Sequence, residues 1–182
     1  PEVHLTLTVR GMRPSATVAI NEHCNRLLSE GREIYTLGLG QSPFPGPEPV
    51  VEELRANAHQ KDYLAVTGLP ALREAVADYH RRRNGYFGAA DDVLIGPGSK
   101  ELMFLLQLVY YGDLVIPTPA WVSYAPQAKI IGRNVSMLAT YSENNWQLTP
   151  EQLDEHCAED SGKPRLVILN YPSNPTGRTY NP

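Results

Sequence analysis

The chain has 182 residues, of which 42% are hydrophobic and 20% charged, and its formal net charge is -4. This length and composition allow a sizeable core, and the acidic balance does not favour a nucleic-acid partner. No run approaches the roughly 18 apolar residues that a membrane span needs, so no membrane partner is expected.

The N-terminal part is predicted to contain a strand, a helix and a second strand. Residues 3–9 alternate apolar and polar side chains, which is typical of a half-buried strand. A helix is predicted over residues 14–29, and Gly31 ends it. Residues 33–40, EIYTLGLG, are predicted as a short strand that leads into a proline-rich loop.

Two helices are predicted after this loop, over residues 50–60 and 70–83. Pro70 suits the first turn of the second helix, and the Asn-Gly pair at 84–85 provides its stop. The basic residues 81–83 complement the negative end of the helix dipole. A solvated helix end therefore explains this basic run better than a nucleic-acid surface does.

From residue 92 onward, apolar runs alternate with helical patterns. VLIG, LVIP, VSMLA and LVILN are predicted strands, and the last helix has Thr149 as N-cap with Gln152 closing a capping box. This alternation indicates an α/β fold with a mostly parallel sheet. The continuous apolar run LVILN predicts a strand that is buried on both faces.

A glycine-rich turn, residues 96–100, joins VLIG to the next helix. Ligands of open parallel sheets bind beyond the carboxyl ends of the strands, and a helix N-terminus offers unpaired N–H groups to an anion. The turn therefore predicts a phosphate site, although a plain connection would use the same residues. The P-loop and dinucleotide patterns do not fit, because Ser99 precedes Lys100 and Glu101 replaces a small residue.

Two further strand ends carry side chains that suit the same site. Trp121 follows LVIP, where it can stack on a planar ring, although a tryptophan there is more often part of the core. Asn174 lies in the proline-rich loop after LVILN, where its amide can point inward, although a bare turn also uses Asn-Pro. An anion cradle, a flat aromatic and a rigid amide together predict a site for a planar phosphorylated molecule.

The remaining features predict an intracellular fragment without a metal site. The five histidines show no ligand spacing. The cysteines, Cys24 and Cys157, do not form a disulfide framework, so a cytoplasmic location is expected. The chain begins without Met and ends on a loop-like dipeptide, so it is expected to be part of a longer protein.

Several segments in a fixed order carry a family resemblance: RPSATVAI, IYTLGLGQSPF, YLAVTGLPALREAVADY, GPGSKEL, PTPAWVSY and NYPSNPTG. They resemble the class I/II aminotransferases, fold-type I enzymes that depend on pyridoxal 5'-phosphate (PLP). The resemblance implies a three-layer sandwich with a mostly parallel sheet. Residues 1–45 would form an N-terminal arm and a segment of the small domain, and residues 46–182 an incomplete, PLP-binding large domain.

Carried over to this chain, the resemblance implies a set of cofactor-binding residues. The backbone of Gly98, Ser99 and Lys100 would hold the PLP phosphate. Trp121 would stack on the pyridine ring, and Asn174 would form a hydrogen bond with the phenolic O3'.

The resemblance also implies contacts with a second subunit and with substrate. Tyr63 would reach the phosphate bound in the partner subunit of a homodimer, and Gly40 would lie against the substrate carboxylate. Two segments depart from the family pattern. Residues 41–44 read Gln-Ser-Pro-Phe instead of Glu-Pro-Asp-Phe, and residues 63–65 read Tyr-Leu-Ala instead of Tyr-Thr-Pro. Both segments would line the substrate side, so the choice of amino acid stays open.

No catalytic residue is assigned within this chain. Transamination needs a lysine that holds PLP as a Schiff base and a carboxylate that keeps the pyridinium protonated. In the family both follow the Asn-Pro-Thr-Gly loop, as does the arginine that clamps the substrate carboxylate, so all are expected beyond Pro182. Lys100 sits in the phosphate turn, and Lys129 and Lys163 lie in surface contexts, so they are poor substitutes.

Three hypotheses follow. The favoured one is the N-terminal portion of an aminotransferase that moves an amino group between an amino acid and a 2-oxo acid by a ping-pong route. The second keeps the fold and PLP but changes the reaction to that of a C–S lyase or a synthase, because the surroundings of PLP choose the bond that breaks. The third is that the chain by itself is a binding or dimerisation piece that catalyses nothing.

Overall fold

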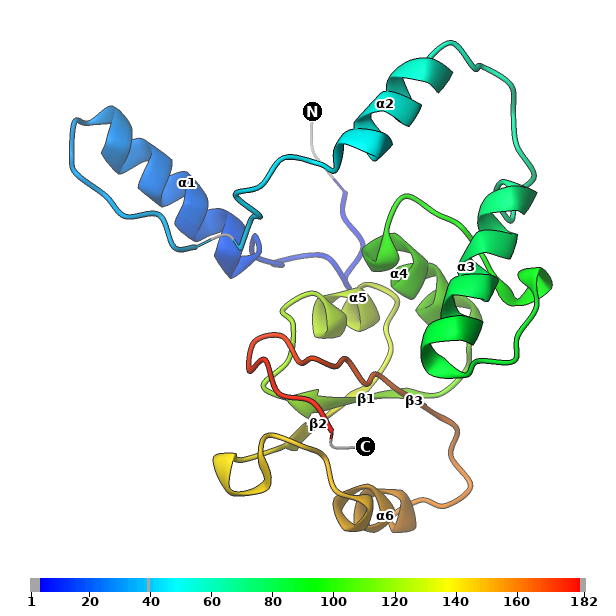
Figure 1. Ribbon diagram of the computed structural model, residues 1–182. Helices are drawn as coiled ribbons and strands as arrows, with labels where there is room; N and C mark the ends of the chain where they lie inside the picture. Colours follow the sequence, from blue (N-terminus) through cyan, green and yellow to red (C-terminus); the bar gives the residue numbers. More distant parts are fainter. Residues whose placement is uncertain (1–3, 39, 181–182) are drawn as a thin grey trace. The chain divides into compact units, whose positions relative to one another are not determined.

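The computed structural model describes residues 4–38 and 40–180 (Figure 1). The described residues up to Gly38 and from Met103 form one compact unit, and those between them, up to Leu102, form a second. The elements in chain order are α1 (Ala16–Ser29), α2 (Glu48–Asn57), α3 (Pro70–Asn84), η1 (Ala90–Asp92), α4 (Ser99–Val109), β1 (Asp113–Thr118), α5 (Tyr124–Ile130), β2 (Val135–Ala139), η2 (Ser142–Asn144), α6 (Pro150–Ala158) and β3 (Arg165–Val167).

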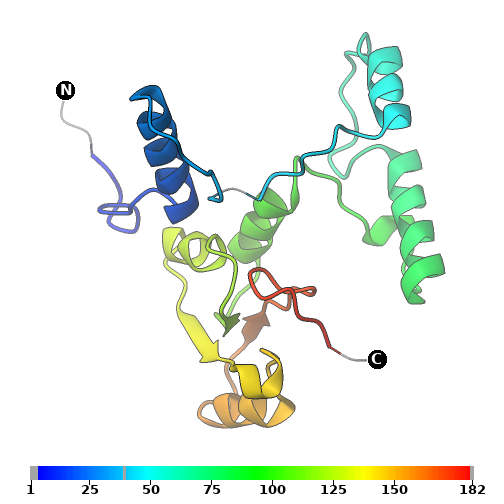
Figure 2. The same ribbon diagram turned by 60° about the vertical axis from the view of Figure 1, so that its left-hand side comes forward.

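A three-stranded parallel sheet lies in the first unit, with the strand order β2-β1-β3. Leu114 of β1 stands opposite Val135 of β2 and Leu166 of β3. Helix α5 connects β1 to β2 and α6 lies between β2 and β3, and the two helices lie on opposite sides of the sheet (Figures 1 and 2). Parallel pairing requires such crossovers, because each must return the chain to the same end of the sheet. The predicted parallel α/β arrangement is confirmed.

The middle of β1 forms the core of this unit. Leu114, Val115 and Ile116 are at most 2% exposed. Leu114 and Ile116 pack with Tyr124 and Ala128 of α5. The apolar run suits a strand that has a neighbour on each side, because its side chains are buried on both faces.

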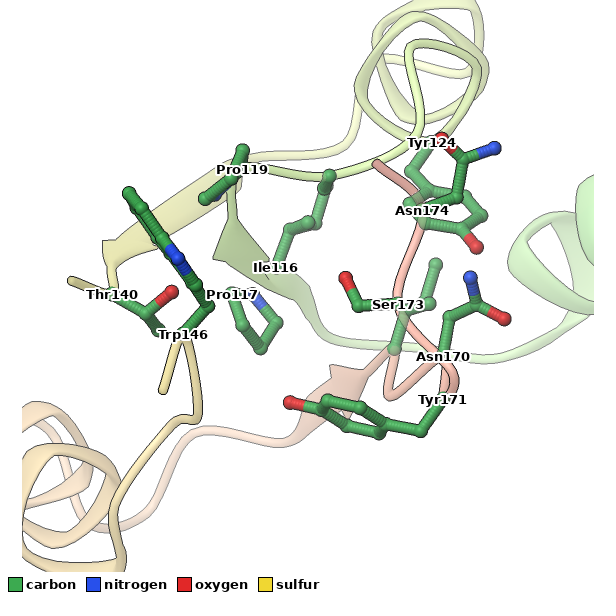
Figure 3. A pocket seen from close by; sticks show the side chains of 12 residues that line it. Ile116, Pro117, Pro119, Tyr124, Thr140, Trp146, Asn170, Tyr171, Ser173 and Asn174 are labelled. Carbon is green, nitrogen blue, oxygen red and sulfur yellow. The ribbon is translucent and has the colours of Figure 1, made fainter. Parts of the chain in front are cut away.

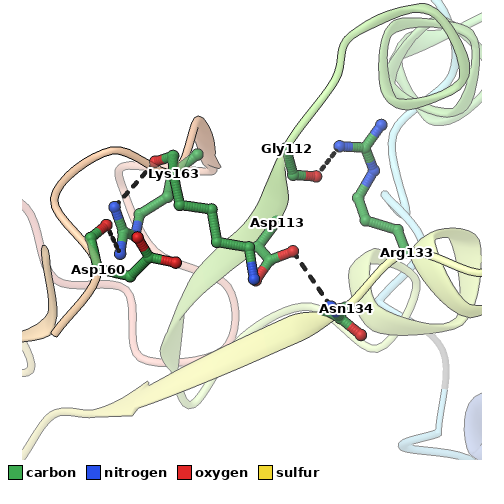
Figure 4. A network of polar contacts seen from close by, with 7 residues as sticks. Gly112, Asp113, Arg133, Asn134, Asp160 and Lys163 are labelled. Atoms are coloured by element: carbon green, nitrogen blue, oxygen red, sulfur yellow. Dashed lines mark hydrogen bonds and ion pairs between the residues drawn. The ribbon is translucent and has the colours of Figure 1, made fainter.

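Arg133, in the turn before β2, joins this turn to the C-terminal end of α4. Its guanidinium donates hydrogen bonds to the main-chain oxygens of Gln107, Tyr110 and Gly112, and Figure 4 shows the bond to Gly112. The last turn of a helix leaves its carbonyl groups without partners in the helix. Arg133 supplies some of these partners and so fixes the path from α4 into β1.

The second unit contains α2, α3 and the segment that leads to α4. Nε of Arg73 in α3 donates to the main-chain oxygen of Val93 at 2.9 Å. The main-chain nitrogen of Ile95 donates to the oxygen of Thr67 at 3.0 Å. At Gly68, where φ is +104°, a Cβ atom would come 2.5 Å from Cβ of Ile95. Glycine is therefore required at this close approach.

The predicted helices and their caps are confirmed. The helices expected over 14–29, 50–60 and 70–83 correspond to α1, α2 and α3, with bounds that differ by at most three residues. Gly85 ends α3 in the left-handed conformation. At α6, the main-chain nitrogen of Gln152 donates to Oγ1 of Thr149 at 3.2 Å, and the side chain of Gln152 accepts from the nitrogen of Thr149 at 3.1 Å.

Two strands predicted in the N-terminal part are wrong within the described residues. The main-chain oxygen of Thr6 accepts hydrogen bonds from the nitrogens of Val9 and Arg10, so a local turn replaces a strand. The described residues of the segment 33–40 form neither helix nor strand. Alternation of side chains is not sufficient for a strand, because a strand also needs a neighbour with which to pair.

The run VLIG, residues 93–96, is not a strand either. Its main chain bonds to the side chain of Arg73 and to the loop at Thr67 instead of to a neighbouring strand. Of the run LVILN, residues 166–170, only Leu166 and Val167 belong to a strand, and both are half-buried in β3 (Arg165–Val167). The prediction that this strand is buried on both faces is wrong, because every residue of β3 keeps part of its surface exposed.

None of the helices in the described part of the chain is both long and apolar enough to cross a membrane. Cys24 and Cys157 are free and half-buried, and the cytoplasmic location expected from the cysteine content stays a prediction. The division into a small-domain segment, 1–45, and a large domain, 46–182, also stays a prediction.

Candidate functional site

A hollow opens at the carboxyl edge of the three-stranded sheet (Figure 3). Its enclosed volume is only about 20 Å³, so it is a shallow hollow that is open to solvent. Segments that follow all three strands line it, and their residues include Pro119, Thr140, Trp146, Asn170, Ser173 and Asn174. Ligands of open parallel sheets bind at this edge, so the hollow is the candidate active site.

Two threonines join the ends of β1 and β2 beside the hollow. The nitrogen and Oγ1 of Thr140 both donate to the main-chain oxygen of Thr118, each at 2.9 Å. Thr140 is only 4% exposed. These buried bonds fix the point at which the chain leaves β1 on its way to Trp121.

Trp121 lies just beyond β1, at the border of the core. Its ring packs edge-on against Tyr124, with 5.4 Å between the ring centroids and an angle of 80° between the planes. Tyr124 also lines the hollow, and burial raises the pKa of its phenol, which favours the neutral form. Trp121 does not itself line the hollow; it packs against the core and against Tyr124, which does.

Asn174 lines the hollow directly, from a closed loop that follows β3. The main-chain nitrogen of Ser173 donates to the oxygen of Arg178 at 2.8 Å, and that of Gly177 donates to the oxygen of Ser173 at 2.6 Å. Gly177 has a φ of +70°, which glycine adopts without strain. The side chain of Asn174 is exposed, so its amide can donate to or accept from a ligand.

The predicted phosphate turn belongs to the second unit. Ser99 is the first residue of α4, and Gly98 before it has a φ of +135°. At Gly96, a Cβ atom would come 2.6 Å from Cδ2 of Leu102, so the chain approaches its own helix closely there. Although no strand precedes this turn, the helix N-terminus on which the phosphate prediction depends is present, with Lys100 in its first turn.

Tyr63 and Gly40 also belong to the second unit, and both are exposed. Exposure of Tyr63 is compatible with the predicted contact to a partner subunit. The structure thus brings Trp121 and Asn174 to one sheet edge, whereas the other predicted site residues lie on the second unit. Their contacts with a cofactor or substrate stay predictions.

Four residues that the sequence does not predict as part of the site also line the hollow: Thr140, Trp146, Asn170 and Tyr171. Asn145 and Trp146 both have positive φ angles, 56° and 59°. This left-handed turn places Trp146 at the hollow. The pair of asparagines before Trp146 is a turn signal, but only the fold shows that the turn stands at the carboxyl edge of the sheet.

Tyr171 is held against Tyr180 beside the hollow. The ring centroids are 4.5 Å apart, and the Tyr171 hydroxyl donates to the Tyr180 hydroxyl at 3.3 Å. Burial and this hydrogen bond raise the pKa of Tyr171 to about 12. The phenol therefore stays neutral through the physiological range of pH.

The lysines of the first unit do not line the hollow. Lys163 binds Asp113 at the amino end of β1, the end of the sheet away from the hollow (Figure 4). Lys129 is exposed in the last turn of α5. Among the described residues, no group of three or more His, Cys, Asp and Glu side chains is placed to hold a metal ion.

Comparison with known proteins places these features in a family. The sequence profile of the aminotransferases of class I and II matches residues 32–182. The chain is 32% identical to the asparagine–oxo-acid transaminase of Streptococcus mutans, over 97% of this chain and 46% of that protein. It is 34% identical to the aspartate aminotransferase of Geobacillus stearothermophilus, over 97% of this chain and 45% of that protein.

Solved structures show the same likeness. The aspartate aminotransferase of Rhizobium meliloti has a TM-score of 0.89 and 28% identity, over 99% of this chain and 46% of that chain. The Thermus thermophilus aspartate aminotransferase with maleate has a TM-score of 0.84 and 30% identity, over 96% of this chain and 46% of that chain. The chain thus spans a little under half the length of these relatives. Because the profile covers most of its residues, the chain belongs to the class I and II aminotransferases, a family of PLP-dependent enzymes.

Proposed function

We propose that the protein containing this chain is a PLP-dependent aminotransferase, which moves an amino group between an amino acid and a 2-oxo acid. Its membership of the family supports this activity. The observation that carries the proposal is the position of Asn174, which lines a hollow at the carboxyl edge of a parallel sheet. The names of several relatives contain aspartate, so aspartate is the first amino donor to assay.

The residues around the hollow fit a planar, hydroxylated cofactor. Asn170, Ser173 and Asn174 line it with polar side chains, of which the Ser173 hydroxyl is turned toward its middle, and Tyr124 and Trp146 provide aromatic walls (Figure 3). Such a mixture of flat apolar surface and a few polar groups is typical of cofactor sites. When bound, PLP supplies the electron sink that stabilises negative charge beside the amino group of the substrate.

Each proposed contact has a physical reason in this chain. Asn174 would orient the cofactor by a hydrogen bond to O3', and its closed loop limits the freedom of that amide. Trp121 would present a flat face to the pyridine ring, and its packing against Tyr124 holds the indole in one orientation. An aromatic ring that is already fixed loses little conformational entropy on binding.

The phosphate contact would come from the start of α4. The main-chain N–H groups of Gly98, Ser99 and Lys100 lie at the N-terminal end of a helix of 11 residues. The positive end of the helix dipole and these donors attract an anion, and the positive φ of Gly98 allows the turn.

The protein is also proposed to act as a homodimer. Tyr63 would reach the phosphate bound in the partner subunit, and Gly40 would lie against the substrate carboxylate. The exposure of both residues supports these roles. The 182-residue chain by itself is proposed to be inactive, because the Schiff-base lysine is expected beyond Pro182. Of the poor substitutes, Lys100 lies in the predicted phosphate turn, Lys163 pairs with Asp113 and Lys129 is exposed on α5.

The test uses the complete protein that contains this sequence, mixed with PLP. We expect a change in the visible absorbance of PLP, and transfer of the amino group from aspartate to an added 2-oxo acid. A keto acid that forms without any amino acceptor would instead indicate a lyase. Absence of both the spectral change and the transfer would overturn the proposal.

A further inference from the structure

The two ends of the loop that carries Asn174 are joined by a pair of tyrosines. Tyr171 precedes Asn174 and Tyr180 follows it, and their rings lie edge to face at an angle of 67°. The Tyr171 hydroxyl donates to the Tyr180 hydroxyl at 3.3 Å. The loop is therefore closed at its base by side chains, in addition to the main-chain bonds at its tip.

The same pair attaches the loop to the segment before α6. The Tyr180 hydroxyl donates to the main-chain oxygen of Leu148 at 2.7 Å, and Leu148 is only 6% exposed. Nε2 of Gln147 donates to the oxygen of Thr179 at 2.8 Å. The capping box of α6 begins at the next residue, Thr149, so the anchoring point is itself held in place.

We propose that Tyr180 is a positioning residue for Asn174: through Tyr171 and Leu148 it holds the loop in the orientation in which Asn174 faces the hollow. The proposal rests on the proposed function, because the effect of Tyr180 is measured on PLP. Without the Tyr180 hydroxyl, the base of the loop would lose its bonds to both Tyr171 and Leu148.

The pair is suited to this role. Tyr171 lines the hollow itself, and its displacement would change the wall beside Asn174 directly. Its pKa is raised to about 12 by burial and by the bond to Tyr180, so its hydroxyl remains a donor throughout the working range of pH.

The test compares PLP binding by variants of the complete protein. Tyr180→Phe removes the hydroxyl that bonds to both Tyr171 and Leu148 but keeps the ring. Tyr171→Phe removes the hydroxyl that bonds to Tyr180 and lies beside the main chain of Leu148, and it serves as a second variant if Tyr180→Phe does not fold. Tyr111→Phe removes a hydroxyl from an 84% exposed tyrosine just before β1 and is the matched control.

Two quantities are measured for each variant: the Kd of PLP from absorbance titration, and the pH at which the absorbance of bound PLP changes. We expect Tyr180→Phe to raise the Kd about two- to tenfold, which corresponds to the loss of a typical hydrogen bond. We expect it to move the pH midpoint in the same direction as Asn174→Ala, by a smaller amount. Tyr111→Phe should change neither quantity.

A double variant shows whether Tyr180 acts through Asn174. If it does, adding Tyr180→Phe to Asn174→Ala produces little further change, because the group that it orients has already gone. Fully additive effects would overturn the role proposed for Tyr180, and so would a Tyr180→Phe variant that binds PLP like Tyr111→Phe. In either case PLP binding by the wild type would still uphold the proposed function. A wild type that does not bind PLP would overturn both.

Discussion

Nζ of Lys163 lies 2.6 Å from Oδ2 of Asp113, at the amino end of β1. Nδ2 of Asn134, just before β2, donates to the other carboxylate oxygen at 3.3 Å (Figure 4). Lys163 precedes β3, so this carboxylate connects the beginnings of all three strands. The polar network holds one end of the sheet, and the candidate site occupies the other.

The stability of the protein should depend on the ionisation of Asp113. The hydrogen bond from Lys163 lowers the pKa of Asp113 from its ordinary value of 3.8. A lowered folded-state pKa gives stability that is present above the unfolded pKa and is lost as the pH falls through the folded one. Asp113→Asn should therefore be less stable than the wild type at neutral pH, and the difference should shrink below pH 3.8.

Melting temperatures of both proteins between neutral pH and strong acid test this prediction. Asp62→Asn is the matched control, because Asp62 pairs with Lys61 but its side chain is 91% exposed. The control should change little, since exposed ion pairs contribute little. A constant difference between Asp113→Asn and the wild type across this range would contradict the role given to Asp113.

Replacement of the N-cap of α6 should lower stability. Oγ1 of Thr149 accepts from the nitrogen of Gln152 at 3.2 Å, and Thr149→Ala removes this acceptor. We expect a loss of about 1 kcal/mol in the free energy of unfolding, measured in urea. Thr149→Ser keeps the hydroxyl and should retain most of the stability. Equal losses in both variants would show that the cap contributes nothing.

Tyr171 should ionise at unusually high pH. Its pKa is raised to about 12 in the folded protein, against an ordinary value of 10.0, with burial as the largest cause. A raised folded-state pKa gives stability that is complete below pH 10.0 and is lost as the pH rises toward 12. A pH titration of the tyrosinate absorbance should show a late ionisation near pH 12 in the wild type that is missing in Tyr171→Phe. Ionisation of Tyr171 near pH 10.0 would contradict its burial.

The turn before α4 should not tolerate a side chain at Gly98. Its φ of +135° is rare for other residues, although a Cβ atom there would meet nothing within 4 Å. Gly98→Ala should therefore act through backbone strain, costing about 1–3 kcal/mol, and should weaken PLP binding. Gly162→Ala is the control. A Cβ atom at Gly162 would also meet nothing within 4 Å, but Gly162 does not have a positive φ, so this substitution should have little effect. Equal PLP affinities in the two variants would count against the phosphate turn.

The helices were predictable because their signals are local. The residues that define a helix end lie within a few positions of it, as Pro70 and Gly85 do at α3 and the pair Thr149 and Gln152 does at α6. The strands were predicted less well. Residues 4–9 and 93–96 have strand-like patterns, but hydrogen bonds to nearby turns and to Arg73 take the place of a neighbouring strand. Pairing depends on distant residues, which a pattern of side chains does not reveal.

In the candidate site, too, residues in local motifs are predictable from the sequence, whereas residues placed by distant contacts are not. Trp121 and Asn174 were found because they lie in short motifs, and the structure places both at one sheet edge. Trp146 reaches that edge through a left-handed turn. Tyr180 attaches the loop to the segment before α6 by a bond to Leu148, far away in the sequence. Such contacts arise from the tertiary fold, so the sequence gives no local sign of them.

The most direct test of the proposed PLP site is a structure of the complete protein crystallised with PLP. We expect one PLP molecule with its phosphate at the main chain of Ser99, its ring against Trp121 and its O3' within hydrogen-bonding distance of the Asn174 amide. PLP bound elsewhere, or bound without any contact to Asn174 and Trp121, would contradict it.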